Sequence, residues 1–165
     1  MELWIISGII AAVVVYFMFK DKGTAHKAAF KNFIPNHPEL FTGKYKNLRA
    51  SIVHDAEKVF FEKLYNDKTF TNPDKDVALT VFYATCGSLA TIGKMSNVPV
   101  NIGTTQFMAT DNLQQFGGDI LTDLLKKKLI TIQEFDVLEP LLLDATLKAA
   151  GTDLQTMRSL LQNKN

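Results

Sequence analysis

Apolar residues recur at three- and four-residue spacings along most of the chain, which is the period of an α-helix, so the sequence predicts an all-α fold. The clearest amphipathic helix is expected over residues 47–65. Its apolar face consists of Leu48, Ile52, Ala56, Val59, Phe60 and Leu64. A shorter helix is expected over residues 24–33, ending before Pro35, and a loop or single turn over residues 36–46.

Another helix is expected to begin after Asn72. The Asn72 side chain can cap the helix, and Pro73, Asp74 and Asp76 follow in its first turn. The next stretch, Val77–Ile92, carries no charged side chain and predicts a central helix buried on most sides. Its length approaches that of a membrane span, which is the alternative interpretation.

The boundaries after this helix are predicted from loop and glycine signals. Residues 96–105 are expected to form an extended loop around the core. A helix over residues 104–116 is expected to end at Gly117 and Gly118, and another to begin at Asp119.

Two helix starts and one stop are predicted near the C-terminus. Thr131 and Glu134 have the spacing of a capping box, and the helix that they open meets Pro140, where it either kinks or gives way to a new helix. Gly151 is expected to end this region, and Thr152 opens a second capping box before a final helix.

The N-terminal run, residues 3–19, contains no charged side chain in 17 positions. As a helix it would be about 25 Å long, nearly the thickness of a bilayer core, which predicts a single transmembrane anchor. A cleaved signal peptide is disfavoured because only Glu2 precedes the run. Basic residues follow the run and none precede it, so the N-terminus is expected outside and the helical bundle in the cytoplasm.

Small residues within this anchor form a candidate packing face for another transmembrane helix. They are Ser7, Gly8, Ala11 and Ala12, in two overlapping pairs with four-residue spacing. Such a stripe lets two helices approach closely, although small residues are also common in membrane helices without any partner.

The length of the chain indicates its domain organisation, and its charge limits the classes of partner. We expect an anchor over residues 1–22, a juxtamembrane helix and loop over residues 23–46, and one compact helical domain over residues 47–165. The net charge of +1 gives no support for nucleic-acid binding, and the run Lys126–Lys128 is best explained as a solvated helix end. The single cysteine, Cys86, is expected to be a buried thiol.

The sequence shows no catalytic, cofactor-binding or metal-binding signature. The three histidines, His26, His37 and His54, lie in no ligand motif, and the pair His54 and Glu57 lacks the further carboxylates of a di-iron site. No phosphate-binding loop or nucleophile elbow is present.

Together these features predict a single-pass protein of the cell membrane, or of the inner membrane in a bacterium. Its expected function is protein–protein interaction, as a membrane-tethered adaptor or an accessory subunit of a membrane complex. The expected contacts are the lipid bilayer and another membrane or membrane-associated protein, or a second copy of the chain. A cytoplasmic-side binder of a lipid or other apolar small molecule, with Val77–Ile92 lining its pocket, is the alternative. An enzyme with scattered catalytic residues is the third possibility.

Overall fold

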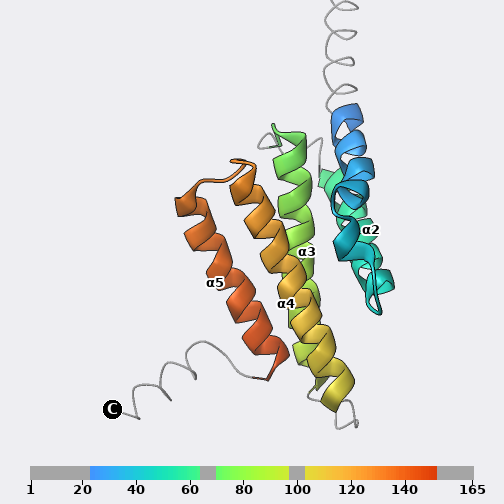
Figure 1. Cartoon of the computed structure of the whole chain (residues 1–165), viewed down its shortest axis with the longest axis vertical. Coiled ribbons are helices and arrows are strands. Elements are labelled where there is room, and N and C mark those ends of the chain that lie inside the picture. The colour runs from blue at the N-terminus through green and yellow to red at the C-terminus, as the bar shows by residue number, and fades with distance from the viewer. Residues whose placement is uncertain (1–22, 64–69, 97–102, 152–165) are drawn as a thin grey trace, which may run out of the picture.

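The computed structural model describes residues 23–63, 70–96 and 103–151, and over these residues the chain is all-helical, as the sequence predicts. Residues 23–36 form the first helical segment. The elements that follow are η1 (Pro38–Phe41), α2 (Lys46–Lys63), α3 (Pro73–Ser96), α4 (Gly103–Lys126) and α5 (Ile132–Ala149). Helix α3 is central, because it contacts α2, α4 and α5, and residues 23–36 lie beside α2 at one side of the bundle (Figure 1).

Several predictions fall outside the described residues. These are the anchor over residues 3–19, its packing face of Ser7, Gly8, Ala11 and Ala12, and the final helix after Thr152. Among the helices that the structure does describe, none is both long and apolar enough to cross a membrane. This finding includes α3, which contains the run Val77–Ile92.

The prediction of a buried central helix is confirmed in α3. Val81, Phe82 and Leu89 are fully buried, and so is Thr85. The Thr85 hydroxyl donates a hydrogen bond to the Val81 carbonyl one turn earlier, at 2.9 Å. Because hydroxyls in this helix are satisfied by its own backbone, polar side chains can enter the core without an unpaired donor.

Three of the predicted helix boundaries are also confirmed, at Asn72, Thr131 and Gly151. The Asn72 side chain accepts a hydrogen bond from the Lys75 backbone N–H at 3.2 Å, and α3 begins directly after it. Thr131 and Glu134 form the reciprocal capping box at the start of α5. Gly151, with φ at +79°, follows α5 and allows the left-handed turn that ends it.

The predictions that a helix ends at Gly117 and Gly118 and that another begins at Asp119 are wrong, because α4 is continuous from Gly103 to Lys126. Its buried face, which includes Leu113, Phe116 and Ile120, continues at helical spacing on both sides of the two glycines. The glycine at 117 has a packing role instead. A Cβ there would lie only 2.7 Å from Cδ1 of Leu142 on α5, so glycine permits the two helices to approach closely.

The helix predicted to end before Pro35 continues past it, and no new helix begins at Pro140. The first helical segment continues through Pro35 to residue 36, where the His37 backbone N–H donates to the Ile34 carbonyl at 3.1 Å. Pro140 lies inside α5, which neither stops nor restarts there. The Pro140 ring lies on the exposed side, while the buried stripe of α5 continues from Leu138 to Leu142.

Two smaller expectations also differ from the structure. Val59, on the predicted apolar face of α2, is 45% exposed, whereas Arg49 on that helix is buried. The expected loop over residues 96–105 is shorter, because α3 extends to Ser96 and α4 begins at Gly103.

Candidate interaction surfaces

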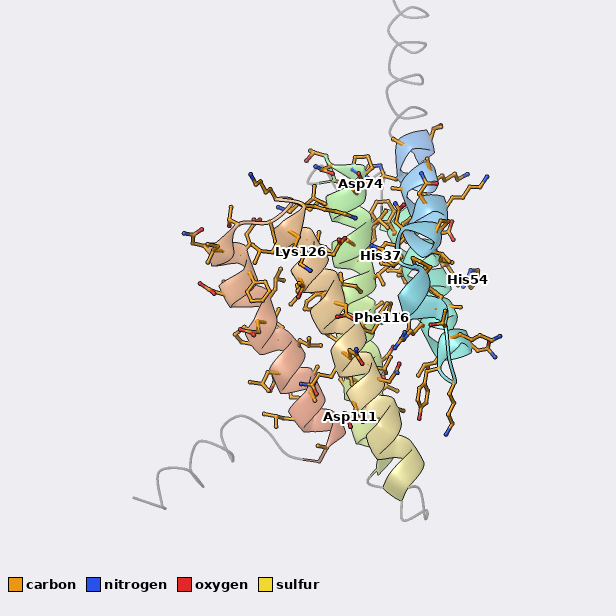
Figure 2. The ribbon with its side chains drawn as sticks, in the orientation of Figure 1. His37, His54, Asp74, Asp111, Phe116 and Lys126 are labelled. Atoms are coloured by element: carbon orange, nitrogen blue, oxygen red, sulfur yellow. The ribbon has the colours of Figure 1, made fainter. Side chains whose placement is uncertain are left out.

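The described residues contain no group of three or more His, Cys, Asp or Glu side chains that could hold a metal ion. His54 is exposed on the outer side of α2 (Figure 2), and Glu57 is half-buried on the same helix. The other two histidines are buried and face carboxylates, so their observed contacts are structural ones.

The two buried histidines attach the segment 23–37 to the central helices. His26 Nε2 lies 2.9 Å from Asp76 Oδ2 on α3, and His37 Nε2 lies 3.4 Å from Asp123 Oδ2 on α4. Lys127 Nζ lies 2.8 Å from the same Asp123 oxygen. Sequence reasoning missed these pairs because partners such as His26 and Asp76 are 50 positions apart.

Aromatic packing completes this attachment. The ring of Phe60 on α2 lies 5.0 Å from the His26 ring, 5.4 Å from Phe30 and 4.6 Å from Phe70, measured between centroids. Phe30 and Phe33 are almost fully buried. The segment that would follow the predicted anchor is therefore part of the hydrophobic core.

Arg49 connects α2 to α4. Its Nε donates to Asn112 Oδ1 at 2.9 Å, and its guanidinium lies 5.5 Å from the centre of the Phe116 ring. Burial lowers the pKa of Arg49, and the nearby Asp119 carboxylate opposes this effect. A buried arginine that stacks on an aromatic ring and donates to an amide fixes the relative position of two helices.

Cys86 is half-buried on α3 and packs against the core. Desolvation raises the pKa of its thiol to about 11. Because the thiolate is the reactive form, this cysteine has little nucleophilic character at neutral pH.

The first candidate interaction surface, which we call the Tyr83 face, is formed by exposed side chains from three helices. Val59 on α2 is 45% exposed, Tyr83 on α3 is 53% exposed, and Val137 on α5 is 66% exposed. Tyr83 lies between two open hollows. One, of about 430 Å³, is shared with Val59, and the other, of about 340 Å³, is shared with Val137.

Polar residues surround these hollows. Asp55 and Lys63 border the first, and Gln133 and Glu134 border the second. Glu134 Oε1 accepts a hydrogen bond from Lys75 Nζ at 2.7 Å. This bond, followed by the hydrogen bond from the Thr131 backbone, lowers the pKa of Glu134 to about 2, so the rim carries a carboxylate at all physiological pH values.

The alternative function places an apolar pocket along Val77–Ile92. This run lines the two hollows through Leu79, Thr80, Tyr83 and Ala84. The large apolar side chains Phe82 and Leu89 have no exposed surface and are packed into the core.

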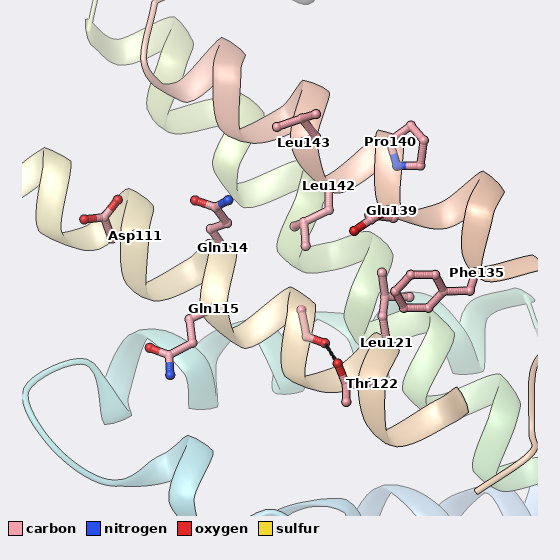
Figure 3. A pocket seen from close by; sticks show the side chains of 11 residues that line it. Asp111, Gln114, Gln115, Leu121, Thr122, Phe135, Glu139, Pro140, Leu142 and Leu143 are labelled. Atoms are coloured by element: carbon pink, nitrogen blue, oxygen red, sulfur yellow. Dashed lines mark hydrogen bonds between the residues drawn. The ribbon is translucent and has the colours of Figure 1, made fainter. Parts of the chain in front are cut away.

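The second candidate surface is the α4/α5 groove, a depression of about 620 Å³. Its apolar side chains include Phe135, Leu142 and Leu143 from α5, and its polar rim includes Gln114 and Gln115 from α4 (Figure 3). Its charged lining residues are Asp111 and Glu139, both acidic.

Comparison with known proteins adds no functional assignment, because no protein-family model, curated protein or solved structure matches this chain.

Proposed function

We propose that this chain is a membrane-tethered protein that acts by binding another protein, as an adaptor or an accessory subunit of a membrane complex. The tether is the uncharged run over residues 3–19, followed by Lys20 and Lys22. This arrangement of charges favours an N-terminus outside and a helical bundle in the cytoplasm.

The position of the first described residue supports a close connection between tether and bundle. Gly23 is four residues after Phe19, the end of the uncharged run, so even an extended chain separates them by no more than about 14 Å. Phe30 and Phe33, only slightly further along, are buried in the core. A bundle held this near to the membrane meets other membrane proteins at a raised local concentration.

The observation that carries the proposal is the Tyr83 face. Exposed valines flank an exposed tyrosine, and charged and amide side chains surround them, which is the arrangement found at protein interfaces. Tyrosine is enriched among the residues that contribute most to binding. Covering Val137, which is 66% exposed, would also remove apolar surface from water. The partner we propose is a protein of the same membrane.

Photo-crosslinking in the native membrane tests whether the Tyr83 face binds this partner protein. A photoreactive phenylalanine analogue at Tyr83 should give a discrete crosslinked protein that fractionates with the membrane. The same analogue at Thr91, an exposed position on α3 outside both hollows, is the matched control and should not give this product. Tyr83→Asp should remove the corresponding stoichiometric species from the purified complex.

Two results would overturn the proposal. One is an unchanged complex in Tyr83→Asp. The other is crosslinking at position 83 to lipid alone, which would favour the apolar small-molecule alternative.

The tether has its own test. The full chain should stay in the membrane fraction after alkaline extraction, and a reporter after Asn165 should be active only if it functions in the cytoplasm. Within the tether, Gly8→Ile should weaken binding to a membrane partner or to a second copy if Ser7, Gly8, Ala11 and Ala12 form a packing face. If alkali releases the chain from the membrane, the tether prediction is wrong. The proposal that the Tyr83 face binds a protein would not be contradicted by this result.

A further inference from the structure

We infer that the α4/α5 groove is the binding site of this chain's own C-terminal segment, residues 152–165, which docks there as an amphipathic helix. The groove offers apolar surface to an occupant, because its lining residue Leu143 is 44% exposed and Phe135 is only partly buried. It is separate from the Tyr83 face: none of its lining residues borders the two hollows beside Tyr83.

The direction of the chain at the end of α5 suits this docking. Gly151 has a φ of +79°, a left-handed conformation in which the chain leaves the helix axis. The stretch over residues 152–165 would be about 21 Å long as a helix. If it runs back along α5, the same rise per residue places it over α5 from Ala149 to about residue 136. The α5 residues of the groove, Phe135 to Leu143, fall almost entirely within that length.

The sequence of the segment has the required apolar face. Leu154, Met157 and Leu161 recur at spacings of three and four residues, so a helix presents them on one side. Ser159 falls on the opposite side. Helices that bind in grooves use this pattern of apolar anchors.

Charge complementarity favours the same occupant. The charged residues lining the groove, Asp111 and Glu139, are both acidic. The segment carries Arg158 and Lys164 against one acid, Asp153, and that acid lies at the expected helix start, where a negative charge is favourable. Both the apolar face and the basic side chains of the segment therefore match the groove.

Crosslinking within the full chain tests the docking. In a Cys86→Ser background, Leu143→Cys combined with Met157→Cys places one thiol in the groove and one on the apolar face of the segment. A short bismaleimide should then join the two thiols within one chain, detected by intact mass. The matched control combines Leu143→Cys with Ser159→Cys and should give a several-fold lower yield.

A charge exchange gives an independent measurement. Arg158→Glu should lower the crosslinking yield by about two- to five-fold, the effect expected for a pair at a solvated rim. Combining it with Glu139→Arg should restore the yield. Equal yields at positions 157 and 159 would overturn the inference, because an undocked segment has no preferred face. Crosslinks found only between chains would also overturn it and would assign the groove to a second copy.

Discussion

Replacing Gly117 with alanine tests whether the close approach of α4 and α5 determines how the bundle packs. A Cβ at this position would lie 2.7 Å from Cδ1 and 3.1 Å from Cδ2 of Leu142. Carbon atoms prefer separations of about 3.5–4.0 Å, so the Leu142 side chain would have to move. Gly118 is the matched control, because a Cβ there would meet nothing within 4 Å.

The expected difference in stability between Gly117→Ala and Gly118→Ala follows from helix propensity and from over-packing, which have opposite signs. Alanine is favoured over glycine inside a helix by about 1 kcal/mol, so Gly118→Ala should stabilise the protein by about that amount. At Gly117 the same gain is opposed by over-packing against Leu142, which is only 7% exposed. Over-packing typically costs about 1–3 kcal/mol, which leaves Gly117→Ala between neutral and about 2 kcal/mol destabilised.

Thermal unfolding of the full chain in detergent, followed by far-UV circular dichroism, measures this difference. A change of 1 kcal/mol shifts the midpoint of a chain this long by about 2–4 °C, so Gly118→Ala should melt clearly above Gly117→Ala. In a Leu142→Ala background the penalty at Gly117 should disappear, because the clashing atoms are gone. Equal stabilisation by both alanines in the native background would refute the close-approach argument.

Three further changes test other parts of the structure. Phe60→Ala should lower the free energy of unfolding, measured by chemical denaturation, by about 3–5 kcal/mol, because this ring is 1% exposed at the centre of the aromatic cluster. A near-neutral result would place Phe60 outside the core. Lys128→Gly should raise the thermal midpoint by relieving about 1 kcal/mol of strain at a φ of 56°, and an unchanged midpoint would contradict that strain. The lowered pKa of Glu134, about 2, means that its stabilising contribution is complete above the ordinary glutamate pKa and is lost as the pH falls through about 2. In Lys75→Met this pKa should rise, as measured by NMR titration, and a value still near 2 would show that the ammonium group is not its main cause.

The helical class and most helix starts of the described residues can be predicted from the sequence, because they depend on side chains a few positions apart. The capping pair of Thr131 and Glu134, the cap at Asn72 and the stop at Gly151 all act within one turn of the backbone. The apolar period likewise identified Phe60 and the central helix α3 as core. The uncharged run over residues 3–19 remains a sequence prediction, as do its packing face and topology.

The roles of Gly117, of the buried histidines and of Tyr83 depend on how the helices pack, and the sequence pattern does not predict them. Gly117 has the local character of a helix stop, but the side chain that requires glycine there, Leu142, comes from another helix. His26 contacts Asp76, which is 50 positions away in the sequence. Because α3 is apolar on nearly every side, its period could not show that Tyr83 faces solvent between α2 and α5. Contacts between distant segments depend on how the helices pack, and the spacing of apolar residues along each helix does not predict that packing.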